Sequence, residues 1–420
     1  MTAGWRSKPL ADVCQFINRG ISPVYLEVGG VAVLNQKCVR DHTVNLQLGR
    51  RHDLAVKKVT PERFVRAGDV LVNSTGTGTL GRVAQLREDA PEPTTVDSHV
   101  TIVRPTEGLF YPEFFGYALV AIEEKIQAGG EGCGGQTELS RTKLADGYQV
   151  SFPTDLNEQR RIVAVLDEAF EGIATAKTNT EKNLQNAREL FASQREVMLS
   201  GNGLDWDEAR LGDLCDVRHG YAFEGEFFTS AGDYVLLTPG NYYESGGYRD
   251  RGEKQKFFIG PIPDDYVLSE RSLLVAMTEQ AAGLLGSPLL VPEPNRFLHN
   301  QRLGLVVGKP GIAWMNDFFF HVFNLKRVRA EIQASASGVK VRHTSPSKIG
   351  TVRVAFPRTV EEQSEVASKL AEVAEQCEQL VVSYERKLVA LDELKKALLH
   401  QAFTGKLTEK SADKRVAKVA

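Results

Sequence analysis

The sequence FPTDLNEQRRIVAVL at residues 152–166 returns 204 positions later as FPRTVEEQSEVASKL at residues 356–370. This interval stays constant as far as two glycines, Gly201 and Gly405. A constant interval means that neither copy has gained or lost residues, which is typical of a helix. A glycine just past the last turn permits the left-handed conformation that often ends a helix. Each copy therefore predicts a helix of about 45 residues, roughly 67 Å long.

Apolar residues follow a near-heptad pattern along both predicted helices, at steps of mostly four and three. A chain with two such helices can bury both patterns by packing one helix on the other. We therefore predict an intramolecular antiparallel coiled coil; the alternative is that each helix packs only on its own domain. The pattern comprises Ile162, Leu166, Ala169, Ile173, Ala176, Leu184, Ala187 and Leu190 in the first helix, and Val366, Leu370, Val373, Cys377, Leu380, Leu388, Leu391 and Leu394 in the second.

Each predicted helix follows a segment rich in glycine, proline and short β-branched runs, and the two segments open alike. The residues Trp5, Leu10 and Cys14 return as Trp206, Leu211 and Cys215. Such composition predicts mixed, β-rich domains with few helices. The predicted fold class is α+β, and the chain is predicted to contain an internal pseudo-twofold repeat. Its parts are β-rich domains at 1–154 and 205–358, long helices at 155–204 and 359–408, and a disordered tail at 409–420.

The overall composition excludes several classes of protein. The 51 Lys and Arg residues against 54 Asp and Glu give a net charge of −3, which excludes a uniformly basic surface for nucleic acid or acidic membranes. No run of 18 apolar residues exists and the start lacks the apolar core of a signal peptide, so we expect a cytoplasmic protein without a membrane partner. Five scattered cysteines without a Cys-x-x-Cys pair argue against disulfide scaffolds and zinc sites.

Any nucleic-acid site must therefore be local, and two stretches concentrate positive charge. Residues 37–66 hold eight basic against three acidic residues, and residues 326–358 hold eight against one. Lys and Arg at this density can neutralise several phosphates, and neighbouring histidine and amide side chains can read base edges. The alternative interpretation is a solvated surface, because folding can dilute any linear cluster of charge.

The sequence offers no convincing catalytic motif. GTGTLG at residues 76–81 matches the dinucleotide-binding pattern Gly-x-Gly-x-x-Gly, but Pro91 and Pro93 follow where that pattern requires a helix. We interpret this stretch as a turn in a β-rich domain. There is also no Gly-x-x-x-x-Gly-Lys-Ser/Thr loop and no His-Glu-x-x-His zinc helix. We therefore expect neither catalytic residues nor a metal site.

Several motifs, taken together, are specific, although the glycine turn among them is degraded in the second half. They are GDVLVN at 68–73, TGTGTLG at 75–81, DSHV at 97–100, the junction FP…EQRRI at 152–162 with its partner FP…EQ at 356–363, and LLHQAFTGKL at 398–407. With these motifs, the chain over residues 1–408 resembles the specificity subunits of type I restriction–modification systems.

This resemblance implies a non-catalytic, DNA-binding subunit with two target-recognition domains, each reading one half of a bipartite, asymmetric site in double-stranded DNA. It implies that the helices set the spacing and dock two modification (methyltransferase) subunits, and that restriction (translocase and nuclease) subunits can complete the complex. S-adenosylmethionine, ATP and Mg²⁺ are then expected on the partner subunits and no cofactor on this chain. The alternative is a two-domain coiled-coil scaffold that binds proteins and not DNA.

The candidate DNA-binding residues combine the basic stretches, the glycine turn and their counterparts in the second half. Among them, the Lys340-Val341-Arg342 run is the strongest prediction for the second domain, because it lies in the acid-poor stretch. The first domain contributes Lys37, Arg40, Arg50, Arg51, Ser74, Thr75, Thr77, His99, Gln136 and Arg141; the second contributes Tyr221, Asn241, Thr278, Arg302, Lys340, Arg342 and His343.

Overall fold

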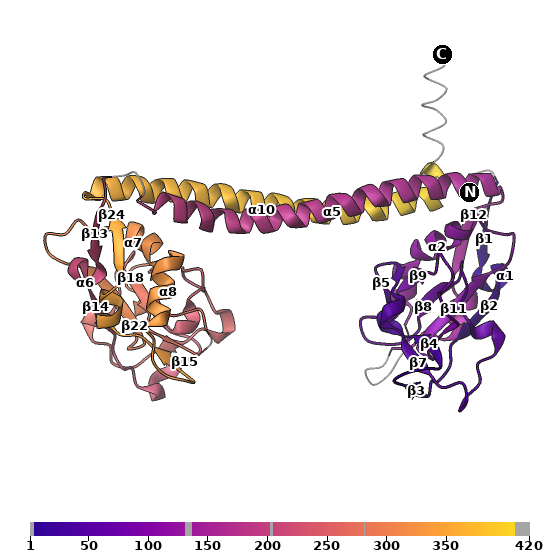
Figure 1. Cartoon of the computed structure of the whole chain (residues 1–420), viewed down its shortest axis with the longest axis horizontal. Coiled ribbons are helices and arrows are strands. Elements are labelled where there is room, and N and C mark those ends of the chain that lie inside the picture. Colours follow the sequence, from indigo (N-terminus) through magenta and orange to yellow (C-terminus); the bar gives the residue numbers. More distant parts are fainter. Residues whose placement is uncertain (1–3, 131–136, 202–204, 281, 408–420) are drawn as a thin grey trace, which may run out of the picture. The chain divides into compact units, whose positions relative to one another are not determined.

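A computed structural model describes residues 4–130, 137–201, 205–280 and 282–407. The predicted tail at 409–420 and the candidate residue Gln136 lie outside the described residues. The chain forms two compact units: Met1–Glu181 with Arg386–Ala420, and Lys182–Glu385. Each unit contains one β-rich domain and a part of each long helix (Figure 1).

Two four-stranded sheets form the domain of the first unit. The central sheet is antiparallel, and the second sheet combines one parallel pair with antiparallel pairs. The central sheet has the order β2 (Cys14–Arg19), β11 (Val100–Pro105), β8 (Val70–Asn73) and β9 (Val83–Gln85); the second has the order β10 (Thr94–Val96), β4 (Val31–Leu34), β7 (Arg50–His52) and β3 (Tyr25–Leu26).

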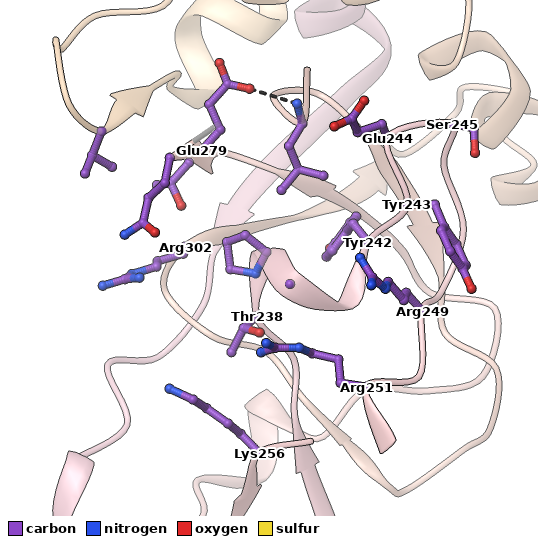
Figure 2. Close-up of a pocket in the computed structure, with 16 residues that line it drawn as sticks. Thr238, Tyr242, Tyr243, Glu244, Ser245, Arg249, Arg251, Lys256, Glu279 and Arg302 are labelled. Carbon is purple, nitrogen blue, oxygen red and sulfur yellow. Dashed lines mark hydrogen bonds between the residues drawn. The ribbon is translucent and has the colours of Figure 1, made fainter. Parts of the chain in front are cut away.

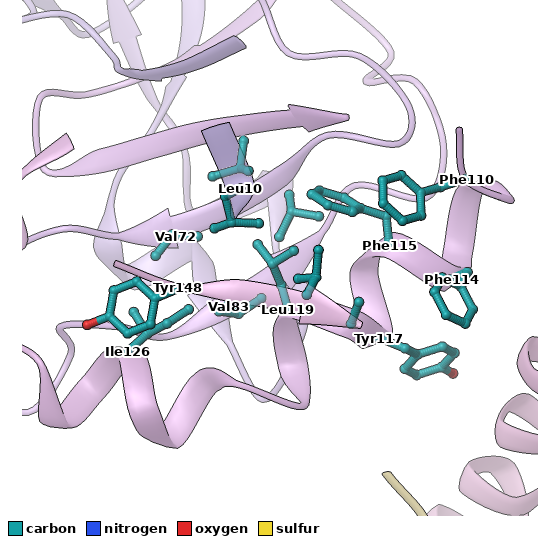
Figure 3. Packing of buried hydrophobic residues seen from close by; sticks show 14 of the residues in the cluster. Leu10, Val72, Val83, Phe110, Phe114, Phe115, Tyr117, Leu119, Ile126 and Tyr148 are labelled. Carbon is teal, nitrogen blue, oxygen red and sulfur yellow. The ribbon is translucent and has the colours of Figure 1, made fainter. Parts of the chain in front are cut away.

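Strand β8 lies at the centre of this domain and is buried on both faces, which explains its continuous run of apolar residues. Val70 and Val72 belong to a core beneath helix α2 (Pro112–Val120), whereas Leu71 belongs to a second core on the other face. Side chains alternate between faces along a strand, so a single short strand contributes to both cores. Figure 3 shows the first core, in which Phe110 packs 4.9 Å from Phe115 between ring centroids.

The second unit repeats this topology. Its strand β18 also divides its side chains between two cores, with Leu273 and Val275 on one face and Leu274 on the other. Helices α7 (Asn316–Phe323) and α8 (Lys326–Ala334) cover the first of these cores. The sheets have the orders β14 (Cys215–His219), β22 (Leu303–Gly308), β18 (Leu273–Ala276), β20 (Pro288–Leu290), and β15 (Phe228–Thr229), β17 (Phe257–Phe258), β16 (Tyr234–Leu236), β21 (Phe297–Leu298).

Both predicted long helices are present, as α5 (Leu156–Met198) and α10 (Val360–Phe403). The first unit contains the start of α5 beside the end of α10, and the second unit contains the reverse combination, so the pair is antiparallel. Ion pairs between the helices join Lys177 to Asp392 at 2.7 Å and Arg188 to Glu385 at 2.9 Å. The α+β fold with an intramolecular antiparallel helix pair is therefore confirmed.

The apolar pattern on the helices is buried unevenly. Ile162 and Leu166 at the start of α5, with Leu399 and Ala402 at the end of α10, complete the core of the first unit. The expected positions Leu190, Leu380 and Leu394 are instead 39–47% exposed, because two paired helices cover only one side of each other. Burial in the described helices is therefore deepest where a β-rich domain also packs on the pair.

At the duplicated junction between domain and helix, one glutamine in each copy makes the same set of hydrogen bonds. Gln159 is fully buried; its amide oxygen accepts a hydrogen bond from the Tyr111 N–H at 2.8 Å, and its amide nitrogen donates to the carbonyls of Leu109 and Pro153. Gln363 makes the same three hydrogen bonds, to the Met315 N–H and to the carbonyls of Ala313 and Pro357. Each glutamine thus joins the first turn of a long helix to its domain.

Short strand pairs and terminal glycines frame the two long helices. Strand β12 (Gln149–Pro153) pairs with β1 (Trp5–Pro9), and β24 (Arg353–Phe356) pairs with β13 (Asp207–Arg210). Gly201 and Gly405 have φ values of 69° and 77°, the left-handed conformation predicted from the sequence. Among the described residues, no helix is long and apolar enough to cross a membrane.

Candidate nucleic-acid interface

An open polar cleft of about 540 Å³ lies at the end of strand β8 in the first unit. Backbone hydrogen bonds hold three chain segments together around it. The Ser74 N–H donates to the His99 carbonyl at 2.8 Å, and the Ser74 carbonyl accepts from the Leu139 N–H at 2.8 Å. Thr75 also forms a β-bridge with Glu138. Side chains at positions 75, 99 and 138 therefore line one cleft.

A chain of polar side chains orients His99 in this cleft. The Gln36 amide nitrogen donates to the Thr75 hydroxyl at 2.8 Å and also to the Thr75 carbonyl. The Thr75 hydroxyl lies 2.7 Å from Nδ1 of His99, and the imidazole is exposed. Opposite, Arg19 pairs with Glu138 at 2.6 Å. The cleft thus offers hydroxyl, amide and imidazole groups rather than excess positive charge.

A buried turn fixes the backbone of His99. The Asp97 carboxylate accepts a hydrogen bond from the His99 N–H at 2.9 Å, and burial raises the pKa of Asp97. Beside this turn the chain passes so closely at Gly20 that a Cβ atom there would lie 1.8 Å from the Val96 carbonyl oxygen. Only glycine fits at that position.

A larger cleft of about 880 Å³ occupies the equivalent place in the second unit. The Met277 N–H donates to the Arg302 carbonyl at 3.1 Å, and the Met277 carbonyl accepts from the Thr344 N–H at 3.0 Å. Thr278 pairs with His343 between strands β19 (Thr278–Glu279) and β23 (Arg342–His343). These contacts repeat those around Ser74. Met277 and Arg302 follow Ser74 and His99 by 203 residues, and Thr344 follows Leu139 by 205.

The turn before Arg302 also repeats its counterpart. The Asn300 side chain accepts a hydrogen bond from the Arg302 N–H at 3.1 Å, as Asp97 does from His99. Gly220 replaces Gly20, and a Cβ atom there would lie 2.4 Å from the Asn300 carbonyl. Next to this turn, burial lowers the pKa of His299 to about 4, and its Nε2 donates to the Leu303 carbonyl. Position 302 is therefore the structural equivalent of position 99.

Positive charge distinguishes the second cleft from the first. It is lined by Arg249, Arg251, Lys256 and Arg302. In Figure 2 the side chains of Arg251, Lys256 and Arg302 all extend toward the same side of the view. Across the described part of the chain, none of the four cations has a carboxylate partner, whereas Arg342 pairs with Glu279 at 2.8 Å. Glu244 and Glu279 also line this cleft, so four cations stand against two carboxylates, and this excess of positive charge favours an anionic ligand.

Two predicted residues of the second domain have different surroundings. Asn241 is fully buried: its oxygen accepts from the Thr238 N–H at 3.0 Å, and its nitrogen donates to Gln255 at 2.9 Å. It supports the cleft from below and cannot present its amide to a ligand, which corrects the prediction of a DNA contact. Tyr221 is 39% exposed, lies 5.2 Å from the Tyr266 ring, and does not line the cleft.

The basic run at 340–343 enters the cleft only in part. Val341 lines it, Lys340 is exposed beside it, and His343 is exposed on strand β23. The Arg342 guanidinium is held by Glu279 and by the Gln333 carbonyl. Arg342 therefore fixes strand β23 against the cleft and has little freedom to contact a ligand.

The basic residues predicted in the first domain do not line its cleft. Arg51 binds the carbonyls of Gly29 and Gly30 and pairs with Glu92 at 2.6 Å, so its guanidinium is engaged within the chain. Arg50 stacks 3.4 Å above the centre of the Tyr25 ring. Lys37, Arg40 and Arg141 are exposed at other places in the domain. Of the predicted residues, Thr75, Thr77 and His99 line the cleft, with buried Ser74 beneath them.

Several cleft residues were not predicted from the sequence. Arg19 lies outside both basic stretches, and Gln36 is a neutral residue directly before the first of them, so charge density singled out neither residue. In the second unit, Arg249, Arg251 and Lys256 lie within a short segment that also holds Lys254. This cluster of basic residues is a sequence signal from which the cleft could have been predicted. Acidic residues Asp250 and Glu253 interrupt the pattern and balance it in any count of net charge.

The duplicated fold, with an equivalent polar cleft in each copy and an antiparallel helix pair, defines a tandem-domain protein with two corresponding candidate binding sites. Residues 203–381 match the family described as the type I restriction modification DNA specificity domain. The chain is also 26% identical over 210 residues to the type I restriction enzyme EcoBI specificity subunit of Escherichia coli. That match covers 50% of this chain and 40% of the relative, so this chain spans less than half of the relative's length.

Two solved structures share the fold along nearly the whole chain. A chain from a structure concerned with complex assembly and conformational transition of the type I R-M system has a TM-score of 0.73 at 15% identity, covering 97% of this chain and 99% of that one. The HsdS subunit from Thermoanaerobacter tengcongensis has a TM-score of 0.65 at 16% identity, with 97% and 98% covered. Residues 203–381 are thus similar to the type I restriction–modification specificity domain, the family that the sequence motifs resemble, and nearly the whole chain shares the fold of these two structures.

Proposed function

We propose that the chain is the DNA-reading subunit of a type I restriction–modification complex and that each cleft reads one half of a bipartite site. The observation that supports this most directly is the repetition of the cleft. The same three segments, held by the same backbone hydrogen bonds, surround both clefts, while the side chains that line them differ. One frame with two sets of side chains suits recognition of two different half-sites.

The electrostatics of the clefts agree with a DNA ligand. Arg249, Arg251 and Lys256 carry charges without carboxylate partners among the described residues, and such groups release counterions when they contact phosphates. His99, Gln36 and Thr75 supply donors and acceptors suited to base edges. We propose that this chain reads sequence without carrying catalytic groups of its own.

The remaining parts of the proposal concern the helices and the partners. Helices α5 and α10 connect both units with 43 and 44 residues, and we propose that they set the distance between half-sites and dock two modification subunits. S-adenosylmethionine would then lie on those subunits, and ATP with Mg²⁺ on restriction subunits where these are present.

The test is the salt dependence of DNA binding by the full chain. A DNA reader should lose affinity steeply with added salt and keep a sequence preference, because phosphate contacts supply the first property and base contacts the second. Replacing Arg251 by Ala should weaken binding to all sequences and reduce the salt slope by about one unit. Binding that is absent at low salt would contradict DNA reading and favour a protein-interaction scaffold.

Exchange of one domain tests the assignment of half-sites. Residues 205–358 should be replaced by the equivalent domain of a relative, in the presence of its modification partner. The methylated sequence should change in one half only. A change in both halves would contradict the two-reader proposal.

A further inference from the structure

We infer that positions 99 and 302 are the equivalent base-reading positions of the two clefts, and that Arg302 forms a guanine-binding site. This inference rests on the proposed function, because it assigns one contact within a DNA-reading cleft. It adds the identity of a recognised base, which neither the fold nor the family resemblance supplies.

The first step is that the backbone at both positions is held in the same way. The N–H of each residue is bound by an Asx side chain two residues earlier, at 2.9 Å for His99 and 3.1 Å for Arg302. The carbonyl of each accepts from the residue just after strand β8 or β18, at 2.8 and 3.1 Å. Both backbone groups are therefore satisfied, and only the side chain remains available at each position.

The second step is that the side chains of His99 and Arg302 are both exposed in their clefts, beside neighbours of which several are constant or engaged. Thr75 and Thr278 are the same residue type at equivalent positions. Glu138 is paired with Arg19, and the carboxylate of Glu279 is paired with Arg342. Positions 99 and 302 therefore combine a fixed backbone, an exposed side chain and a change in chemistry between the two units.

The third step concerns Arg302 itself. Its guanidinium has no hydrogen-bond or ion-pair partner within the described residues. The backbone of Arg302 is fixed, because its N–H donates to Asn300 and its carbonyl accepts from Met277. A guanidinium presents two parallel N–H donors, and guanine offers two matching acceptors, O6 and N7, in the major groove. Thymine and adenine each present one acceptor there and cytosine presents a donor, so guanine is the base that satisfies both donors.

The other three cations of the cleft have a different placement. Arg249 and Lys256 lie against aromatic rings, 5.9 Å from the centre of Tyr243 and 5.4 Å from that of Phe228. Arg251 lies against Gly240, where a Cβ atom would be 2.9 Å from its guanidinium nitrogen. All three come from one loop rather than from the shared frame at the strand ends. We assign them to phosphate contacts, which position the DNA without selecting a base.

At the equivalent position of the first cleft, His99 presents different hydrogen-bonding groups to a base than Arg302 does. Because the Gln36 amide donates to the Thr75 hydroxyl, that hydroxyl is free to donate its own proton to Nδ1 of His99. In the tautomer in which this hydroxyl donates to Nδ1, the imidazole carries its proton on Nε2 and offers a single donor to a ligand. A single donor selects a base acceptor such as a purine N7, with weaker discrimination than the paired donors of Arg302.

The test uses the full chain and a library of duplex DNA in which two segments are randomised around spacers of varied length. The wild-type chain should select guanine at one position of one half-site. Arg302→Ala should reduce the preference for guanine at that position by about 5- to 150-fold, leaving the other half-site unchanged. His99→Ala should affect one position in the other half-site only.

Lys256→Ala is the matched control, since it removes a cation from the same cleft. It should weaken binding to all sequences and lower the salt slope by about one unit, without changing any base preference. If Arg302→Ala behaves in the same way as Lys256→Ala, Arg302 is a phosphate contact and the guanine assignment is overturned. If the wild-type chain shows no salt-dependent binding to the library, the proposed function itself fails, and the guanine assignment fails with it.

Discussion

At the residue scale, the two buried glutamines at the helix junctions illustrate how one side chain can determine a connection. Gln159 and Gln363 are each 0% exposed and each satisfy one backbone N–H and two carbonyls. Removing the amide takes away the hydrogen bond that the glutamine supplies to each of these backbone groups. An unsatisfied buried group costs about 1–3 kcal/mol, so the loss is large for a single residue.

We predict that Gln159→Ala destabilises the first unit by roughly 2–4 kcal/mol and that Gln363→Ala does the same to the second. Hydrogen exchange measured by mass spectrometry on the full chain reports each unit separately. Gln159→Ala should speed exchange in peptides around Tyr111 and leave peptides around Met315 unchanged. The control is Gln185→Ala on the exposed surface of α5, which should alter neither. Equal protection in Gln159→Ala and the wild type would contradict the role assigned to this amide.

At the scale of the element, helix α7 packs on the end of α5 through a histidine that is held neutral. The His321 ring lies 6.0 Å from the Phe191 ring. Burial, with the nearby charges of Arg195 and Arg271, lowers the pKa of His321 to about 4. In the unfolded chain its pKa is about 6.5. The unfolded state therefore binds this proton first as the pH falls.

It follows that the contribution of His321 to stability is fully present above pH 6.5 and is lost as the pH falls toward about 4. The expected loss is on the order of 1–3 kcal/mol, localised to the second unit. His321→Phe keeps an aromatic ring and removes the titration, so it should flatten the pH dependence of unfolding measured by urea denaturation. An unchanged pH profile in this variant would show that other groups are responsible.

Sequence patterns predicted the elements much better than they predicted the clefts. The long helices follow from a 204-residue interval and a local apolar pattern, both of which are visible along the chain. The clefts assemble from segments distant in sequence, such as 36, 75, 99 and 138, whose proximity depends on strand pairing. Arg51 shows the limit most clearly: a basic residue in a basic stretch, its guanidinium is captured by Gly29, Gly30 and Glu92. Density of charge in sequence does not reveal which charges remain free.

At the scale of the whole molecule, the helices α5 and α10 are continuous elements shared by both units. Their ion pairs define the register of the antiparallel pair, with Lys177 opposite Asp392 and Arg188 opposite Glu385. An insertion in one helix must therefore be matched by an insertion at the residue opposite it. By the register of the Lys177–Asp392 ion pair, Leu391 lies opposite Thr178, so an insertion after Thr178 is matched by one after Leu391.

We predict that inserting seven residues after both Thr178 and Leu391 shifts the recognised site toward a longer gap between half-sites. Seven residues keep the heptad pattern in phase and lengthen a helix by about 10 Å, close to three base pairs of DNA. Three base pairs also rotate the duplex by nearly a third of its roughly 10.5-base-pair repeat, so weaker binding should accompany the longer gap. Mapping of the methylated sites, with the modification partner present, would measure both effects. The bases within each half-site should stay the same, since the clefts are untouched. Methylation only at the original spacing, with undiminished efficiency, would mean that the helices do not set the distance.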